Sequence, residues 1–358
     1  MRIHVTDIQD GDQLSHDIFN HYGLHVLSKG TRLYKNEISR LLQHQIDQVE
    51  ILDRNLVLPS GEAVSPVNRT LESTVNPKWL PTVQPIYENA VKRFEKLFES
   101  AIEDGIVQEA EVTEIVQPLL DNLQLERDVV SMLLLLNTED DYTYQHSVQV
   151  GMLAYYLATW LDHSSEDASL IGKAGFLHDI GKSKISADIL NKPGKLTEEE
   201  FEEVKRHTLY GHEIILGSFQ EKDLAIGALQ HHERIDGSGY PHGLKGDEIH
   251  PISKIITVVD IYSAMISARV YQKERDLLFV LKELYRLSFS EIDPVTTHTF
   301  IKHMIPNFIG KRVRLNNERF GIIVMTHPTE FFRPLVQIDD EFVDLTIDRH
   351  YEIEHVYL

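Results

Sequence analysis

The chain has 358 residues, of which 42% are hydrophobic and 25% charged, so it is long enough for two or three globular domains with sizeable cores. It contains no cysteine, which excludes disulfides, thiolate nucleophiles and zinc–thiolate sites. The formal net charge of −21 argues against a nucleic-acid partner, because phosphate backbones need a basic surface.

The N-terminal sequence MRIHVTDIQDGDQL has no apolar signal region. The longest apolar stretch, GMLAYYLATWL from Gly151, is about half as long as the roughly 20 residues that a membrane helix needs. We therefore expect a soluble, cytoplasmic protein that does not bind membranes. The 19 histidines, many of them in the middle of the chain, are the most informative feature of the composition.

The first part of the chain predicts a small module and a linker. Residues 1–52 alternate short apolar runs with turn signals and end in the helical stretch NEISRLLQHQ, which indicates a small α+β module. Residues 53–85 are rich in Pro, Ser and Asn and lack periodicity, as expected of a linker or irregular segment.

Helical periodicity follows. Apolar residues recur at steps of three and four from Ile86 to Ala101 and again from Ile115, which predicts connecting helices over residues 86–140 with Pro118 as a break or kink. Helical segments continue to about Ile309, so residues 141–309 are predicted to form an all-α domain. Its turns are expected at residues 162–164, 192–194, 237–239 and 293–294.

The sequence pattern changes from helical to strand-like at residue 310. RVRLNNERFGIIVM and PLVQIDDEFVDLTI read as strands joined by hairpin turns at Asn316-Asn317 and Asp339-Asp340. Residues 310–358 are therefore expected to form a small C-terminal β module. The fold class is mainly α, with a small module at each end of an all-α domain.

The helical domain carries a series of potential metal ligands without sulfur. Nitrogen and oxygen donors suit iron, manganese, nickel or zinc. Any one histidine is more often a hydrogen-bonded core or surface residue, but the set exceeds what one ion needs and indicates a dinuclear site. The set comprises His146, His178, Asp179, His207, His231, His232 and Asp260.

The fragment LHDIGK is the most specific part of this series. Adjacent His178 and Asp179 on one helix would reach neighbouring coordination positions. Lys182, four residues past His178, is expected on the same helix face, where its ammonium group can meet a substrate phosphate.

Four stretches together resemble the HD-GYP family, which belongs to the HD-domain superfamily of metal-dependent phosphohydrolases. They are HDIGK, ILNKPGKLTEEEFEEVKRH, HHERIDGSGYPHGLKGDEI and VVDIYSAM, and the likeness spans about residues 141–309. The resemblance implies an all-α HD-type domain with two or three divalent metals, often iron or manganese, with nickel, zinc or magnesium as alternatives. It also implies hydrolysis of cyclic di-GMP to the linear dinucleotide pGpG, or onward to GMP.

The resemblance assigns roles to residues of this chain by position. The seven groups named above would be the metal ligands, with Asp179 bridging two ions that share a catalytic hydroxide. Lys182 would contact the scissile phosphate. The nucleotide would be held by Gly239, Tyr240, Pro241 and Arg269.

The chain departs from the family pattern at a few positions. Tyr142 stands where one branch has a glutamate that assists a third metal, which favours two metals here. Ser263 replaces a frequent aspartate three residues after the last ligand, and Lys254 stands where arginine is usual. No ligand is missing, so we expect an active phosphodiesterase.

Other readings remain open at this stage. In the first, the same site would hydrolyse another cyclic dinucleotide such as cyclic GMP-AMP. In the second, the domain would be a catalytically weak protein that binds a cyclic dinucleotide and signals through its conformation. The candidate partners are a second copy of the chain, bound through the apolar face of residues 86–101, and a diguanylate cyclase or other signalling protein. The C-terminal module resembles tails of HD-GYP proteins in Gram-positive bacteria and carries no ligand cluster.

Overall fold

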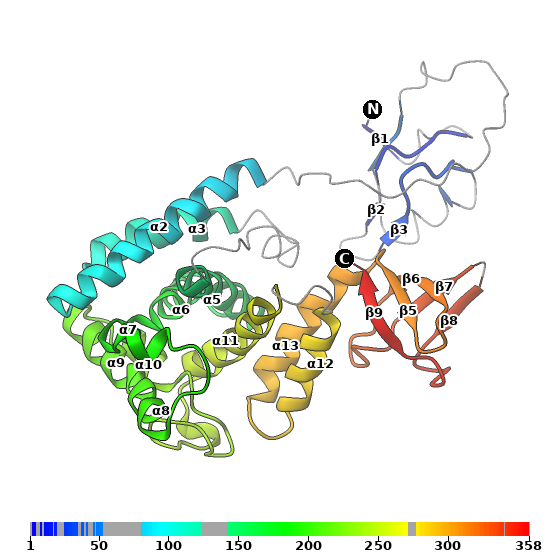
Figure 1. The fold of residues 1–358 in the computed structure, drawn as a ribbon. Helices are drawn as coiled ribbons and strands as arrows, with labels where there is room; N and C mark the ends of the chain where they lie inside the picture. The colour runs from blue at the N-terminus through cyan, green and yellow to red at the C-terminus, as the bar shows by residue number, and fades with distance from the viewer. Residues whose placement is uncertain are drawn as a thin grey trace. The chain divides into compact units, whose positions relative to one another are not determined.

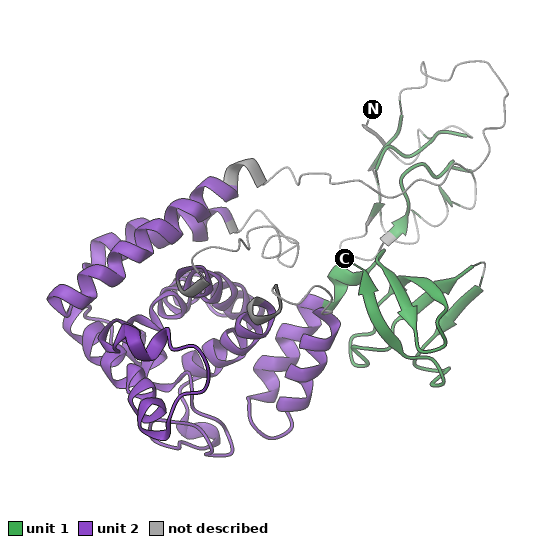
Figure 2. Cartoon of the chain, in the orientation of Figure 1, with its two compact units in different colours: residues 1–76, 305–358 green, residues 77–304 purple. Residues whose placement is uncertain are grey.

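The computed structural model describes residues 80–123, 142–270, 277–339 and 341–357, together with short segments between residues 2 and 52. The chain forms two compact units, coloured separately in Figure 2. One comprises residues 77–304, and the other combines residues 1–76 with residues 305–358. All the candidate ligands belong to residues 77–304, so this helical unit positions the site.

The N-terminal segment contains short strands around a small core. Two antiparallel pairs form, the first from β1 and β4 and the second from β2 and β3. The strands span Arg2–His4 (β1), Ile18–Phe19 (β2), His25–Leu27 (β3) and Gln48–Glu50 (β4). Most of the helix predicted over residues 36–45 lies outside the described residues.

The C-terminal segment is a five-stranded antiparallel sheet in the order β8-β7-β6-β5-β9. Both expected hairpins are present, and Asp339 takes a left-handed φ of 55° between β7 and β8, while Asp340 lies outside the described residues. Strand β9, which pairs with β5, was not among the predicted strands. The strands are Arg312–Leu315 (β5), Phe320–Met325 (β6), Leu335–Ile338 (β7), Glu341–Asp344 (β8) and Ile353–Tyr357 (β9).

The helical unit confirms the expected all-α domain (Figure 1). The turns expected at residues 162–164, 192–194 and 237–239 fall between helices, and Asp293-Pro294 stands at the start of α13. The α-helices are Leu80–Asp104 (α2), Glu109–Leu123 (α3), Tyr142–Trp160 (α5), Ser165–Leu177 (α6), Ala187–Leu190 (α7), Glu198–Lys205 (α8), His207–Ser218 (α9), Lys222–Gln230 (α10), Pro251–Val270 (α11), Leu277–Leu287 (α12) and Pro294–Met304 (α13). Short 3-10 helices span Ile180–Lys184 (η3) and Gly246–Glu248 (η4), and a third, Ile305–Phe308 (η5), begins the C-terminal segment.

Two helices differ from expectation at their prolines. Helix α2 begins six residues before the predicted start at Ile86, because buried Val83 and Tyr87 continue its apolar stripe through Pro85. Helix α3 runs through Pro118, so the expected break is absent. Tertiary packing of the buried neighbours on both sides of Pro118 outweighs the one backbone hydrogen bond that the proline removes.

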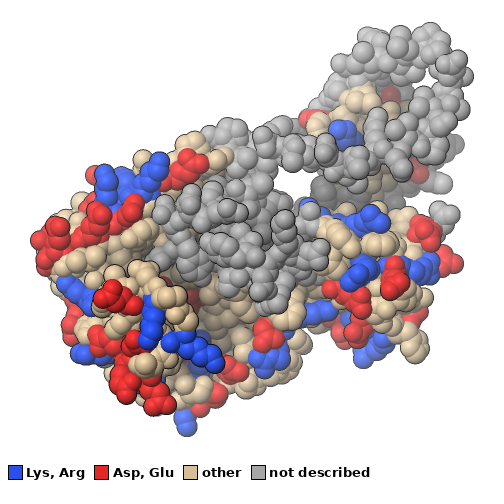
Figure 3. All heavy atoms as spheres, in the orientation of Figure 1, with Lys and Arg blue, Asp and Glu red and all other residues tan. Residues whose placement is uncertain are grey.

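The described helices include none that is both long enough and apolar enough to cross a membrane. On the face of the helical unit seen in Figure 3, acidic and basic side chains are interspersed. In this view the net negative charge of the chain is therefore distributed, and no single-sign field covers the helices.

Close backbone packing beside the candidate site depends on Gly181. A Cβ atom at this position of η3 would collide with the carbonyl oxygen of His207 and the backbone nitrogen of Gly211 in α9. These are backbone atoms, so no side-chain rotation relieves the overlap. Glycine at residue 181 is what allows η3 and α9 to approach each other.

We predict that Gly181→Ala lowers the free energy of unfolding by about 3 kcal/mol, the upper end of the usual overpacking cost. Gly217→Ala in α9 is the matched control, because its Cβ would meet only Ile106 Cγ2 at 3.6 Å. The control should be neutral or stabilise by up to about 1 kcal/mol. Urea unfolding followed by circular dichroism measures both, and equal stability of the two variants would contradict the packing argument.

Candidate metal centre

The His178-Asp179 pair lies at a junction between two helices. Helix α6 ends at Leu177, His178 is its C-cap, and η3 begins at Ile180. The expectation of one continuous helix through His178, Asp179 and Lys182 was therefore wrong. Asp179 has φ −100° and ψ 6°, and this change of backbone direction turns both side chains toward one place. In an unbroken α-helix, adjacent side chains diverge by about 100°.

The other candidate ligands come from four further helices. His146 lies in the first turns of α5, His207 is the first residue of α9, and Asp260 sits in the middle of α11. His231 is the C-cap of α10, and His232 follows it. Six of the seven groups are buried, and His232 is half-buried. The fold thus brings together residues that are more than 100 positions apart.

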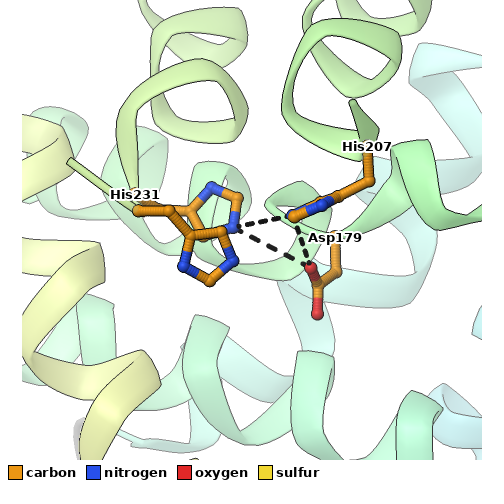
Figure 4. A group of neighbouring side chains, drawn as sticks. Asp179, His207 and His231 are labelled. Carbon is orange, nitrogen blue, oxygen red and sulfur yellow. Dashed lines mark hydrogen bonds and ion pairs between the residues drawn. The ribbon is translucent and has the colours of Figure 1, made fainter. Parts of the chain in front are cut away.

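One group of donor atoms is built around Asp179 and three histidines. Donor atoms of Asp179, His207, His231 and His232 all lie within 4.8 Å of one another. The Oδ1 of Asp179 is 3.4 Å from His207 Nε2 and 3.8 Å from His231 Nε2, and these two nitrogens are 3.3 Å apart. Figure 4 shows the three labelled side chains converging.

A second group shares the same aspartate. Donor atoms of His146, His178 and Asp179 also lie within 4.8 Å of one another. Asp179 Oδ2 is 3.2 Å from His178 Nε2, and Asp260 Oδ1 is 3.1 Å from His146 Nε2. Asp179 therefore presents one oxygen to each group.

Backbone carbonyls orient three of the rings. The Nδ1 atoms of His178, His207 and His231 lie 2.7, 2.6 and 2.9 Å from the carbonyl oxygens of Gly175, Val204 and Ala228, respectively. A carbonyl can only accept, so each Nδ1 carries the proton. Each Nε2 then presents its lone pair to the interior, which is the tautomer a metal ligand requires.

The residues fit a divalent metal ion. His178 Nε2 and Asp179 Oδ1 are buried and have no hydrogen-bond partner within the described chain. Leaving such atoms unsatisfied costs free energy, and coordination would remove that cost. Imidazole and carboxylate donors without sulfur suit first-row divalent ions.

The electrostatics agree with this fit. Burial raises the pKa of Asp179, but the charges of His178 and Lys182 outweigh it and hold the pKa well below its ordinary value. Burial lowers the pKa of His232 to about 3 and that of His231 well below its usual range. Burial lowers the pKa of His178, but the charge of Asp179 outweighs burial and raises it. An ionised Asp179 beside neutral His231 and His232 is the protonation state that binds metal.

Lys182 lies at the exposed side of this centre. Its Nζ donates to Asp179 Oδ2 at 2.6 Å, and its side chain is 28% exposed. The lysine is therefore close enough to the carboxylate to offset its charge while it remains accessible from solvent.

The turn that carries Tyr240 needs two glycines for different reasons. Gly237 has a left-handed φ of 84°. At Gly239 the φ is ordinary, but a Cβ would collide with the backbone of residues 232–234. The resulting close turn, which continues into Pro241, places the half-buried Tyr240 ring 4.7 Å from the His232 ring.

Glu233 is a residue whose role the sequence analysis missed. Its buried carboxylate accepts the backbone N–H groups of His242 at 2.7 Å and Leu244 at 3.0 Å. It thereby ties the segment after Tyr240 to the paired histidines. The position of Glu233 directly after His231 and His232 was the one sequence signal that pointed to this role.

Some site predictions fall outside what the structure describes. Helix α11 includes Arg269, but the side chain of Arg269 lies outside the described residues, as does that of Tyr142 at the start of α5. Ser263 is described and lies 3.0 Å from His146 Nδ1.

Comparison with known proteins agrees with this architecture. A family model described as an HD domain matches residues 129–295. A cyclic di-GMP phosphodiesterase of Pseudomonas aeruginosa, PA4108, is 33% identical over 243 residues, which cover 68% of this chain and 58% of that protein. The protein named 3′3′-cGAMP-specific phosphodiesterase 3 of Vibrio cholerae is 37% identical over 175 residues, which cover 49% of this chain and 38% of that protein.

The chain spans less than two thirds of the length of each of these relatives. Among solved structures, the HD-GYP-type protein Bd1817 of Bdellovibrio bacteriovorus shares the fold, with a TM-score of 0.51 at 15% identity over 84% of this chain and 97% of that one. The motifs, the HD-domain model and the sequence identity to PA4108 show that the chain belongs to the HD-GYP family of HD domains.

Proposed function

We propose that this chain is a phosphodiesterase that hydrolyses cyclic di-GMP to pGpG or onward to GMP. The observation that carries the proposal is the pair of donor groups that share Asp179. The relatives named above support the substrate class, because both are named for cyclic dinucleotides.

In this proposal the centre holds two divalent ions, iron or manganese. One would be held by His146, His178 and Asp260, and the other by His207, His231 and His232, with Asp179 contributing to both. When bound, such ions lower the pKa of coordinated water and stabilise negative charge on phosphoryl oxygens.

The chain's own residues bind and orient the substrate. Lys182 extends from the centre toward solvent, so its ammonium group would donate to a phosphoryl oxygen of the scissile group. Tyr240 presents an aromatic ring beside His232 and, with Gly239 and Pro241, would hold the nucleotide; Arg269 belongs to the same proposal. The surrounding buried helices limit the access of bulk water.

The proposal is tested on one anaerobic preparation by measuring metal content together with turnover of cyclic di-GMP and of 3′3′-cyclic GMP-AMP. We expect two ions per chain and faster hydrolysis of cyclic di-GMP. Faster hydrolysis of 3′3′-cyclic GMP-AMP would identify that dinucleotide as the substrate instead, a candidate that the Vibrio cholerae relative supports. Two bound ions without hydrolysis of either would contradict the proposal.

Removing the shared carboxylate is predicted to remove the metals and the activity together. In Asp179→Ala both donor groups lose a member, so both ions should be lost, whereas His178→Ala should lose the ion of its own group. Activity should fall by more than about 100-fold in each variant, which exceeds the loss typical when a residue that only hydrogen-bonds to a metal ligand is changed. Metal analysis and product chromatography measure these effects. An Asp179→Ala chain that retains two ions would refute the shared-ligand assignment.

Lys182 is predicted to act on the substrate without holding metal. Lys182→Ala should keep both ions and lower kcat by roughly 100- to 1,000-fold, the range measured for loss of one charge-stabilising donor. Lys184→Ala is the matched control, because Lys184 lies in the same 3-10 helix, is exposed and contacts the carbonyl of Ile102. If both variants turn over substrate at the original rate, Lys182 has no part in the mechanism.

A further inference from the structure

A row of buried polar side chains leads from His146 to helix α2. Ser263, Gln149 and Tyr87 are each at most 4% exposed and lie on α11, α5 and α2, respectively. Buried polar groups in a helical interior persist when they are hydrogen-bonded to one another. Ser263, the first residue of the row, contacts the candidate ligand His146.

Helix α11 contacts both nitrogens of the His146 ring. Asp260 Oδ1 lies 3.1 Å from Nε2, and Ser263 Oγ lies 3.0 Å from Nδ1. Residues 260 and 263 are one turn apart, so they project from the same helix face. Unlike His178, His207 and His231, whose Nδ1 atoms face backbone carbonyls, His146 is thus oriented by a side chain.

The directions of these hydrogen bonds fix the tautomer of His146. The hydroxyl of Ser263 donates its single proton to Gln149 Oε1 at 3.2 Å. Toward His146 it can then only accept, so Nδ1 donates its proton to Ser263 Oγ, and Nε2, which faces Asp260, is the nitrogen left for a metal ion. Without Gln149, the serine hydroxyl could rotate and donate to Nδ1 instead, which would favour the tautomer that cannot bind metal through Nε2.

Tyr87 completes the row from outside the HD domain. Gln149 Nε2 donates to the hydroxyl oxygen of Tyr87 at 3.4 Å, which orients the amide so that its oxygen faces Ser263. Tyr87 lies in α2, before residues 129–295 that match the HD model. The helix that precedes the domain thus reaches a candidate ligand through three hydrogen bonds.

We propose that Ser263, Gln149 and Tyr87 are positioning residues that hold His146 in its metal-binding tautomer, and that α2 is therefore part of the support of the centre. This inference rests on the metal centre of the proposed function. It also accounts for the serine at residue 263. A serine can serve in place of an aspartate because Gln149 fixes the direction of its proton.

The test measures binding of Mn²⁺ alone to the full chain, by paramagnetic resonance of the free ion. The variants are Ser263→Ala, Gln149→Leu and Tyr87→Phe. Ser263→Ala should weaken one of two binding events by roughly 10- to 100-fold, as expected for an outer-shell partner. Tyr87→Phe, which keeps the ring, should weaken the same event by about 2- to 10-fold, the effect of one hydrogen bond. The binding event held by His207, His231 and His232 should be unchanged.

Controls separate positioning from general destabilisation. Tyr156→Phe changes another buried tyrosine, one stacked on Trp160, and should leave both binding events unchanged. Ser263→Thr keeps the hydroxyl and should restore binding relative to Ser263→Ala. Because the row acts as one unit, Ser263→Ala and Gln149→Leu together should cost less than the sum of their separate effects.

The outcomes distinguish this inference from the proposed function. If the unmodified chain binds no Mn²⁺, the proposed metal centre itself fails. If the unmodified chain binds two ions and Tyr87→Phe and Ser263→Ala bind them equally well, the centre stands and the positioning role is overturned. Equal weakening of both binding events would also overturn it, because it would indicate a purely structural effect.

Discussion

The rest of the site depends on one buried carboxylate. Asp179 is 2% exposed, and its oxygens are surrounded by imidazole nitrogens and the ammonium group of Lys182. A carboxylate in such surroundings is costly unless cations neutralise it. The helix junction at Asp179, the backbone carbonyls behind three histidines and the close approach at Gly181 all orient groups around it.

The grouping of the candidate ligands was predictable from sequence because most of them lie within short, specific motifs. HDIGK and HHERIDGSGYP identify their donors without any knowledge of the fold, and the structure brings all seven proposed ligands together. The local geometry was not predictable in the same way. Periodicity extends α6 through His178 and Asp179, whereas the backbone leaves the α-helix there, and Pro118 stays inside a helix because its neighbours pack well.

The support of the ligands was harder to predict than the ligands. Ser263 was identified from sequence as a departure from the family pattern. Gln149 contacts Ser263, and Tyr87 contacts Gln149, but both residues lie more than 110 positions before Ser263 in the chain. Contacts between such distant residues depend on how helices cross, which no local pattern encodes. The same limit applies to strand β9, whose partner β5 lies about 40 residues earlier.

The central claim is that catalysis requires both ions around Asp179. It is tested most directly by titrating the metal-free chain with Mn²⁺ and following cyclic di-GMP hydrolysis and bound metal in the same samples. The rate should rise in proportion to the fraction of chains that carry two ions. Full turnover at one ion per chain, or none at two, would contradict it.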